Sequence, residues 1–413
     1  MIITVYFGSK KVGSLFSTDN RGVVFQYSAE YVASKDAVAL SLSLPLRNEE
    51  FSQKECMPFF AGLLPEEDSR KRIADYLHIS ETSTLKLLEA LGGECAGLIT
   101  ITNEENPELD KRIYEFNSEN YEELSDDRIA EYIRKMPERP LIKADEKLRL
   151  SLAGAQEKLS LAKINGKWYL PLNGAPSTHI LKPTRNGSLE TLADNEYICM
   201  KIASGFGIDV PNVDLIEFSG KKVFIIQRYD RLIEGTSIKR LHQEDFCQAL
   251  GLMSEQKYES DGGPGITTIQ NLIKKRFSRP IIDQRAFFNM VAFNFLVGNC
   301  DSHGKNYSVL YKNGLVQLAP MYDAVSTCVY SGLADKLSMK IGNHFELGKV
   351  SRSDFDIVCE NCGVSGSVFE KIFKTFKKAS SSVEESLLTD EKINRELCAK
   401  IFDGIRSRIG LFF

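Results

Sequence analysis

Three polar side chains in the second half of the chain have the types and spacing that phosphoryl transfer requires. Asp301 and Asn306 are separated by four residues in the segment GNCDSHGKN, and Asp323 follows beyond a predicted hairpin. In such an order the first Asp accepts or orients a substrate hydroxyl, while the Asn and the second Asp hold Mg²⁺ against the phosphates of ATP. Mg²⁺ prefers oxygen ligands and keeps several waters, so one amide and one carboxylate suffice. The sequence therefore predicts a catalytic Asp301 and a magnesium site at Asn306 and Asp323.

The same residues also have a simpler interpretation. Asp side chains near turns commonly cap the turn, and a D-x-x-x-x-N spacing is weak when taken alone. The hairpin favours the functional interpretation, because it returns Asp323 to the neighbourhood of Asp301. His303 stands between the acid and the amide, and the order D-x-H-x-x-N resembles the catalytic loop of lipid-kinase-type folds. We therefore expect His303 to organise the loop or to lie next to a phosphate.

A phosphate-binding lysine is expected upstream of this loop. Lys182 ends a predicted strand at residues 178–182, and Glu196 lies in the helix that follows. In protein kinases a strand lysine binds the ATP phosphates and pairs with a helix glutamate. Alternatively, Lys182 protects an edge strand from aggregation, and Glu196 is a first-turn acid favoured by the helix dipole. The order of the segments favours the kinase-like interpretation for Lys182.

Two further segments complete the predicted ATP site. Residues 150–158 read LSLAGAQEK and precede the first strand of this part of the chain. A single glycine excludes a Walker loop, but small residues let backbone N–H groups approach phosphate. Residues 227–229 follow a strand and fall where a hinge would meet adenine, mainly through backbone atoms. The predicted ATP contacts are Ala153, Gly154, Ala155, Gln156, Glu157, Lys158, Lys182, Gln227, Arg228, Tyr229, His303, Lys305, Asn306, Tyr322 and Asp323.

Composition narrows the class of protein. The 413 residues, 43% hydrophobic and 26% charged, are typical of a soluble globular protein with a sizeable core. A formal net charge of −4 argues against a protein whose main task is binding nucleic acid. The N-terminus lacks the pattern of a signal peptide, and the apolar stretch at 287–297 is too short to span a bilayer. We expect a cytoplasmic protein that does not contact a membrane.

Nine cysteines are scattered along the chain and include one CxxC, at Cys359 and Cys362. A zinc site needs about four ligands at suitable spacing. Neither a second CxxC nor a His cluster is nearby, so we interpret these two residues as reduced thiols near a helix end.

The first part of the chain predicts a small sheet and helices. Alternating segments at 3–7, 12–16 and 23–27 are separated by turn residues and predict an antiparallel sheet. Residues 56–92 have a helical pattern that ends at a Gly-Gly pair, and a strand at 97–102 closes the unit. A polar, acidic connection at 104–126 and a helix at 125–136 are expected to follow.

From about residue 148 the pattern predicts a sheet first and helices afterwards. Asn165-Gly166 is a strong hairpin signal between strands at 159–164 and 168–171. Asp194 is predicted to cap a helix at 194–205. After Gln243 helices dominate, and one strand pair interrupts them. The remaining predicted strands are 178–182, 213–218, 223–228, 307–311 and 315–318.

This order predicts an α+β, two-lobed protein-kinase-like (lipid-kinase-like) fold. A β-rich N-terminal subdomain precedes it, and its C-terminal lobe is mainly helical. The predicted divisions are residues 1–105 as the N-terminal subdomain, 106–147 as a connecting helix and linker, 148–242 as the lobe with the ATP-binding sheet, and 243–413 as the helical lobe with the catalytic loop.

Ordered motifs over almost the whole chain resemble the HipA family, the serine/threonine kinase toxins of bacterial HipBA toxin–antitoxin pairs. The N-terminal matches are LSLSLPL at 40–46 and LLP at 63–65. The later matches are SLAGAQEK at 151–158, THILK at 178–182, DNEY at 194–197, KYESDGGPG at 257–265, DSHGKN at 301–306 and YD at 322–323. So many matches in one order argue against chance.

The resemblance implies roles for individual residues. Asp301 takes the place of the family's catalytic Asp, Asn306 and Asp323 those of its magnesium ligands, and Lys182 that of its phosphate lysine. Residues 153–158 correspond to its phosphate-binding loop, and Ser151 to its site of inhibitory autophosphorylation. The resemblance also implies ATP and Mg²⁺ as cofactors, a HipB-like helix-turn-helix antitoxin that binds operator DNA, and an aminoacyl-tRNA synthetase as substrate.

The sequence departs from the family pattern at two places, and two other classes of function are possible alternatives. Gln227 stands where the family can have an acidic hinge residue, and the stretch between Lys182 and Asp194 is short. A small-molecule or lipid-type kinase has no evident need for the N-terminal subdomain. An antitoxin-binding co-repressor with little catalysis has no need for an intact set of Asp301, Asn306, Asp323 and Lys182.

Overall fold

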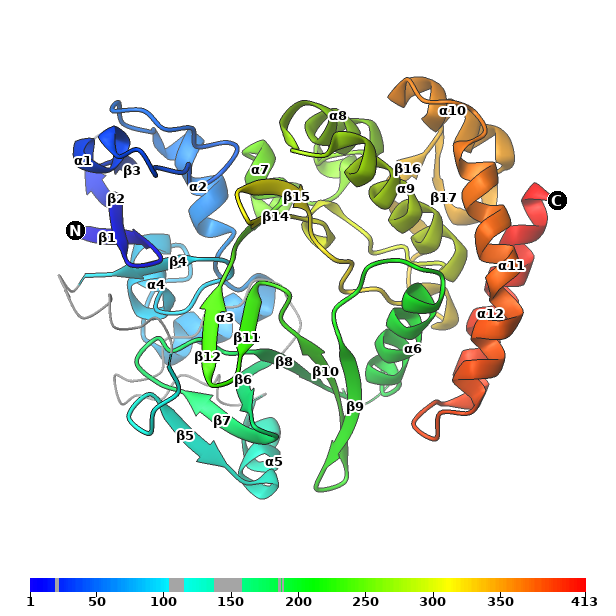
Figure 1. The fold of residues 1–413 in the computed structure, drawn as a ribbon, viewed down its shortest axis with the longest axis horizontal. Helices are drawn as coiled ribbons and strands as arrows, with labels where there is room; N and C mark the ends of the chain where they lie inside the picture. The colour runs from blue at the N-terminus through cyan, green and yellow to red at the C-terminus, as the bar shows by residue number, and fades with distance from the viewer. Residues whose placement is uncertain (19–21, 104–114, 137–157, 185–186, 188) are drawn as a thin grey trace.

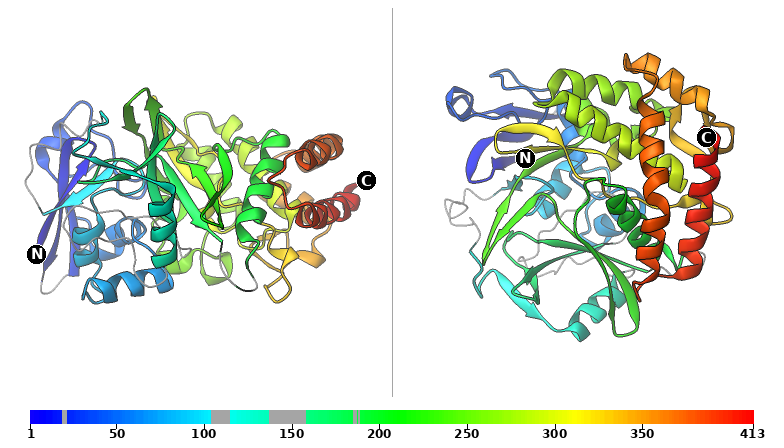
Figure 2. Two further views of the ribbon diagram at one scale, coloured as in Figure 1. Left: turned by 90° about the horizontal axis from the view of Figure 1, so that it is seen from below. Right: turned by 45° about the vertical axis from the view of Figure 1, so that its right-hand side comes forward.

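The structure is a computed structural model that describes residues 1–18, 22–103, 115–136, 158–184, 187 and 189–413. The chain forms three parts, and the first of them contacts both of the others. These are an N-terminal sheet with helices, a six-stranded sheet, and a helical part (Figure 1). Figure 2 shows the N-terminus and the C-terminus on opposite sides of the molecule. This is the α+β, two-lobed arrangement that the sequence predicts.

The first part is an antiparallel sheet in the order β3-β2-β1-β4 with short helices packed against it. Its core centres on Phe25, Phe59 and Phe60, which are fully buried. The helical pattern predicted for 56–92 is confirmed but is divided into three helices, because Gly62 ends the first and His78, at φ +53°, turns the chain out of the second. The elements are β1 (Ile2–Phe7), β2 (Lys10–Thr18), β3 (Gly22–Tyr27), α1 (Ala29–Ala33), α2 (Gln53–Ala61), α3 (Glu67–Tyr76), α4 (Thr84–Leu91) and β4 (Ile99–Thr102).

The second part is an antiparallel sheet in the order β5-β7-β6-β8-β10-β9. Both predicted hairpins are present, and Asn165 and Gly166 turn β6 into β7 with φ values of +50° and +82°. The helix α6 begins after Thr191, so Asp194 is not its N-cap; it lies in the first turn and pairs with Lys222 at 2.8 Å. The elements are β5 (Tyr121–Leu124), α5 (Asp126–Lys135), β6 (Leu159–Ile164), β7 (Lys167–Pro171), β8 (His179–Pro183), α6 (Leu192–Gly205), β9 (Val213–Phe218) and β10 (Lys221–Gln227).

Several strands lack a clear signal in the sequence. The prediction of a single strand pair after residue 243 is wrong, because β14 also pairs with the polar strand β13, and β16 pairs with β17. In β13 the buried Glu244 accepts hydrogen bonds from Ser41 (2.5 Å) and Tyr311 (2.6 Å), so contacts far away in sequence stabilise this strand. The strands are β11 (Arg231–Glu234), β12 (Ser237–Arg240), β13 (His242–Asp245), β14 (Ser308–Lys312), β15 (Leu315–Leu318), β16 (Lys336–Ile341) and β17 (His344–Glu346).

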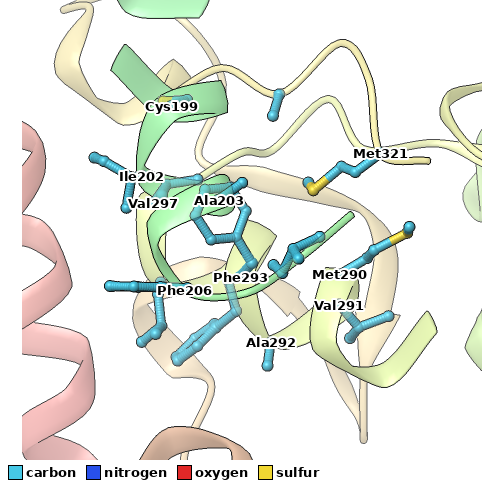
Figure 3. Packing of buried hydrophobic residues seen from close by; sticks show 14 of the residues in the cluster. Cys199, Ile202, Ala203, Phe206, Met290, Val291, Ala292, Phe293, Val297 and Met321 are labelled. Carbon is cyan, nitrogen blue, oxygen red and sulfur yellow. The ribbon is translucent and has the colours of Figure 1, made fainter. Parts of the chain in front are cut away.

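The third part is organised around α9, which precedes the Asp301 loop. This helix is apolar on almost all faces, so neighbouring helices have to enclose it. Figure 3 shows Phe293 and Val297 of α9 among Ile202 and Ala203 of α6 and Phe206, which directly follows α6. Among the described residues, no helix has the length and apolar character needed to cross a bilayer. The helices are α7 (Phe246–Leu250), α8 (Ile266–Arg276), α9 (Pro280–Val297), α10 (Arg352–Cys362), α11 (Val368–Leu388) and α12 (Arg395–Ile409).

A buried network of charges joins the N-terminal part to residues 228–231, which follow β10 along the chain. Glu94, which is 0% exposed, pairs with Arg228 at 3.0 Å and with Arg231 at 2.5 Å. Asp230 pairs with the same two guanidinium groups, at 2.9 and 2.8 Å. Every charge in this group has an opposite partner, which offsets the cost of burying it where these segments meet.

Candidate active site

The loop that carries Asp301 and Asn306 begins at the end of α9. Gly298 caps this helix in the left-handed conformation, at φ +68°. A Cβ at this position would lie 2.9 Å from a neighbouring cysteine sulfur, so glycine is required both by the conformation and by the space. The backbone N–H of Asp301 donates to the side chain of Asn299 at 3.1 Å, which holds the acid at a fixed point of the loop.

Asp301 is exposed to solvent and accepts a hydrogen bond from the phenol of Tyr258, with 2.9 Å between Oη and Oδ1. The surrounding protein limits the hydration of the carboxylate, and this raises the pKa of Asp301 to about 6. The hydrogen bond from Tyr258 acts in the opposite direction, and the negative charge of Asp323 adds to the increase. A carboxylate with this pKa is ionised at neutral pH and is a competent proton acceptor.

Asn306 and Asp323 lie side by side although a hairpin separates them in sequence. Asn306 Nδ2 donates to Asp323 Oδ2 at 3.2 Å. The amide oxygen of Asn306 is buried and has no hydrogen-bond partner among the described residues. An unpaired amide oxygen next to a carboxylate is the hard-oxygen donor set that Mg²⁺ prefers, so these residues fit the predicted metal.

Lys182 connects the sheet to this pair. It lies on β8, between β6 and β10, so the interpretation of an edge-strand lysine is wrong. Its ammonium contacts Glu196 of α6 at 2.6 Å and Asp323 at 2.5 Å. Burial would raise the pKa of Asp323, but the charges of Lys182 and Lys158 outweigh this and lower it to about 2. Asp323 is therefore ionised at any physiological pH, as a magnesium ligand has to be.

Lys158 is a second cation that acts on the same site. Burial and the positive charge of Lys182 lower the pKa of Lys158 to about 8, while Asp323 opposes the shift. Lys158 is the last residue of the predicted phosphate loop. Ser151 and the loop residues 153–157 lie outside the described residues.

His303 lies beside the acid in the same loop. Its ring meets that of Tyr258 edge to face, with 5.2 Å between the centroids. Burial and the charge of Lys257 lower the pKa of His303 to about 4, so the ring is neutral at physiological pH. Its Nδ1 is buried without a hydrogen-bond partner among the described residues. This environment agrees with a residue that organises the loop or faces a polar ligand.

Lys305 does not join the group around Lys182. Its buried ammonium pairs with Asp245 at 2.6 Å and with Glu66 of the N-terminal part at 3.4 Å. The structure therefore directs this side chain to an ion pair that anchors the loop, whereas the sequence places it among the ATP contacts.

The predicted hinge has fewer free backbone groups than expected. The N–H of Gln227 donates to Asn212 O and that of Arg228 to Thr178 O, at 2.9 and 2.8 Å. The side chain of Arg228 belongs to the Glu94 network and not to the nucleotide side of the sheet. Neither N–H group is available to a base in this conformation.

Tyr229 and Tyr322 link the predicted hinge to the loops that carry Asp301 and Asp323. Their rings stack with 5.6 Å between the centroids. The Tyr322 hydroxyl donates to Lys305 O at 2.7 Å and lies 2.6 Å from the hydroxyl of Ser308. Tyr322 thus holds the Asp301 loop against Asp323, its neighbour in sequence.

The sequence gives no site role to three residues that the structure brings to this region. Tyr258 contacts Asp301, Lys257 pairs with Glu66 at 3.2 Å, and Glu66 also pairs with Lys305. Lys257 and Tyr258 stand in the motif KYESDGGPG, which marked the segment but not its function. Glu66 follows LLP at 63–65, and only the folded chain brings it to the loop.

Cys359 and Cys362 lie in the last turn of α10 as buried free thiols. Among the described residues, no group of three or more His, Cys, Asp and Glu side chains is arranged to hold a metal ion.

Comparison with family models divides the chain in two. Residues 3–102 match the HipA N-terminal domain, and residues 150–383 match the HipA-like C-terminal domain. The second match alone covers more than half of the chain.

Individual proteins agree with these matches. The chain is 36% identical to "Putative kinase Y4mE" of Sinorhizobium fredii, over 88% of this chain and 86% of the relative. It is 30% identical to the serine/threonine-protein kinase toxin HipA of Shewanella oneidensis, over 84% and 80% of the two chains. A solved structure of HipA from Shewanella oneidensis with HipB and operator DNA superposes with a TM-score of 0.83 at 24% identity, covering 98% of this chain and 96% of the other.

Proposed function

Since the chain belongs to the HipA family of kinases, we propose that it is an ATP- and magnesium-dependent serine/threonine protein kinase. The observation that carries the proposal is the contact network of Lys182, Asp323 and Asn306, in which the Asn306 amide oxygen has no partner among the described residues. These residues come from a strand, a loop and the segment after a hairpin. A structural network has no need to leave that oxygen unpaired, whereas a magnesium site does.

Each residue has a distinct part in the proposed reaction. Asp301 accepts the proton of the substrate hydroxyl while the hydroxyl oxygen attacks the γ-phosphorus of ATP. Lys182, held by Glu196, binds and orients the phosphates. Asn306 and Asp323 would hold Mg²⁺, which neutralises charge that develops on the transferred phosphoryl group. We also propose that the nucleotide lies between the six-stranded sheet and the helical part. The proposed domain boundaries lie near residues 105, 147 and 242.

The test is incubation of the protein with labelled ATP, magnesium and a bacterial lysate, beside an Asp301→Asn control. The control keeps the shape of the side chain but lacks the proton acceptor, and a loss of about 10²–10⁴-fold in rate is expected. Labelled protein bands that depend on Asp301 support the proposal. Labelled small molecules or lipids would indicate a kinase of another class, and no labelling at all would indicate an antitoxin-binding scaffold.

We propose further that this kinase is the toxin of a toxin–antitoxin pair. The support is the relative named as a kinase toxin and the solved complex of HipA, HipB and operator DNA. The partner would be a HipB-like helix-turn-helix protein that contacts operator DNA, and the substrate an aminoacyl-tRNA synthetase in the cytoplasm. Expression of the chain alone should arrest growth, the partner should relieve the arrest, and Asp301→Asn should be harmless. Growth at a normal rate with demonstrably active kinase contradicts the toxin role.

The remaining proposal concerns Ser151. A phosphate on this residue adds a charge of about −1.5 to −2 at neutral pH. Next to a loop that binds the phosphates of ATP, this charge would oppose nucleotide binding, so autophosphorylation would switch the kinase off. Phosphate mapping by mass spectrometry after incubation with magnesium and ATP tests the site, and ATP binding by the modified protein tests the effect. Modified protein that binds ATP normally rules out the switch.

A further inference from the structure

Two thiols lie next to each other directly beside the proposed active site. The sulfurs of Cys300 and Cys328 are 3.9 Å apart. Cys300 precedes Asp301 in the loop, and Cys328 follows Asp323 by five residues. Cys300 is buried, whereas Cys328 is the exposed member of the nine cysteines.

The backbone holds these thiols together independently of their own contact. The N–H of Cys300 donates to Thr327 Oγ1 at 2.9 Å, and the N–H of Cys328 donates to Gly298 O at 3.3 Å. On its other side, Cys300 O accepts from the N–H of Ser338 at 3.0 Å. Two hydrogen bonds therefore join the segment of Cys300 to that of Cys328, and a third holds Cys300 against β16.

The two thiols have different reactivities. The hydrogen bond from Cys300 and the nearby guanidinium of Arg408 lower the pKa of Cys328 to about 7, against the effect of burial. The same hydrogen bond and burial raise the pKa of Cys300, which stays protonated. An exposed thiolate beside a protonated thiol has the arrangement of a reactive cysteine with its resolving partner.

We propose that Cys300 and Cys328 are a peroxide-reactive pair that closes to a disulfide. The Cys328 thiolate attacks one oxygen of hydrogen peroxide, breaks the O–O bond and becomes a sulfenic acid, and hydroxide leaves. The Cys300 sulfur then attacks the Cys328 sulfur, the S–O bond breaks, and water leaves. The two thiols lose two electrons and two protons in total, and one peroxide is reduced to two waters.

Formation of the disulfide would displace the neighbouring Asp301. An S–S bond is about 2.05 Å long, so the sulfurs have to approach each other by about 1.9 Å from their present separation. Cys300 is bonded to Asp301, and an active-site displacement of about 1 Å can cost about 10²-fold in rate. The disulfide should therefore lower phosphoryl transfer by about tenfold or more. This consequence rests on the proposed kinase function, whereas the disulfide itself does not.

The first experiment follows the thiols of the full-length protein. Reduced protein is treated with hydrogen peroxide and then denatured in the presence of a maleimide, which blocks the remaining free thiols. It is digested without reductant. The expected product is a cross-linked pair of peptides that contain Cys300 and Cys328, abolished by dithiothreitol and absent in Cys328→Ser. A Cys359→Ser/Cys362→Ser double variant is the matched control, because those neighbouring thiols are buried with raised pKa values, and it should form the cross-link normally. A cross-link elsewhere, or sulfinic acid at Cys328 without a cross-link, overturns the pair.

The second experiment measures kinase activity in the same samples. Cys328→Ser should match the wild type under reducing conditions and keep its activity in peroxide, whereas the wild type should lose activity and recover it with dithiothreitol. A cross-linked protein with undiminished activity overturns the coupling to Asp301. Inactivity of fully reduced wild-type protein would instead contradict the proposed function, and the peptide readout separates the two results.

Discussion

The phenol of Tyr258 donates a hydrogen bond to the carboxylate of Asp301, with 2.9 Å between the two oxygens. The substrate hydroxyl of the proposed reaction has to reach the same carboxylate. Burial raises the pKa of Tyr258 above its ordinary value, as does the negative charge of Asp301, so the phenol remains a donor at neutral pH. The hydrogen bond from Tyr258 therefore favours the ionised form of the proposed proton acceptor, against the effect of burial.

Tyr258→Phe should shift the pH dependence of the kinase. A hydrogen bond to a carboxylate stabilises its charged form, so loss of the phenol raises the pKa of Asp301 above its value of about 6. Activity is lost as the pH falls through this pKa, because protonated Asp301 cannot accept a proton. The acid limb of kcat/KM should thus move to higher pH. The control is Tyr132→Phe, whose phenol oxygen is buried without a hydrogen-bond partner among the described residues. If the acid limb of Tyr258→Phe stays at the wild-type pH, the hydrogen bond from Tyr258 does not control the pKa of the proton acceptor.

Asp323→Asn should weaken ATP binding only when magnesium is present. Asn tolerates the left-handed backbone of this position, at φ +59°, and keeps the shape of the side chain. Loss of the carboxylate ligand should weaken binding by about tenfold or more, which corresponds to about 1.4 kcal/mol. Without magnesium, the affinity should stay equal or rise, because a negative charge next to the phosphates is gone. Calorimetry with magnesium and with EDTA compares the two conditions, and equal losses in both would remove the metal role.

The sequence predicts the elements that local patterns determine. Both hairpins of the six-stranded sheet follow from turn residues such as Asn165-Gly166, and the order of Lys182, Asp301 and Asp323 predicts which side chains meet. The pair of Lys182 with Glu196 is confirmed at 2.6 Å. These features depend on short segments whose residue types are informative by themselves.

Other features depend on contacts that no local pattern contains. Strand β13 reads HQED and has no β signal, yet it pairs with β14 because Glu244 is satisfied by residues from distant segments. Lys305 looks like a phosphate ligand from its place in the loop, but Asp245 and Glu66 are closer partners in the folded chain. A lysine ammonium group can pair with either a carboxylate or a phosphate, so spacing alone could not distinguish these roles.

Glu94→Gln should destabilise the protein strongly. The carboxylate is 0% exposed and compensates the guanidinium groups of Arg228 and Arg231. Removing one partner of a buried pair leaves an uncompensated charge and costs about 3–5 kcal/mol. Urea denaturation followed by the fluorescence of Trp168, the single tryptophan, measures the change. Glu396→Gln breaks an exposed pair and should leave the free energy of unfolding almost unchanged. Equal effects of the two substitutions would contradict the role of the network.

Glu66→Gln should lower turnover without changing ATP affinity. Glu66 pairs with Lys257 at 3.2 Å and with Lys305 at 3.4 Å, so one carboxylate of the N-terminal part anchors the catalytic loop through two cations. Lys305 keeps Asp245 and Lys257 keeps Glu67, so the variant should still fold.

We expect Glu66→Gln to loosen the loop that carries Asp301 and to leave Lys182 and Asp323 in place. The N–H of Gly304 donates to Lys257 O at 3.0 Å, so movement of Lys257 passes directly to the segment between Asp301 and Asn306. Misplacement of Asp301 by a fraction of an ångström should lower kcat by about tenfold, whereas Lys182 and Asp323 do not contact Glu66 and should bind ATP as before. Glu67→Gln is the control, because its side chain is 60% exposed and its pair with Lys257 should contribute little. Kinase assays over a range of ATP concentrations separate kcat from KM. An equal loss in Glu67→Gln, or a rise in KM for ATP in Glu66→Gln, would show that the N-terminal part does not act through the loop.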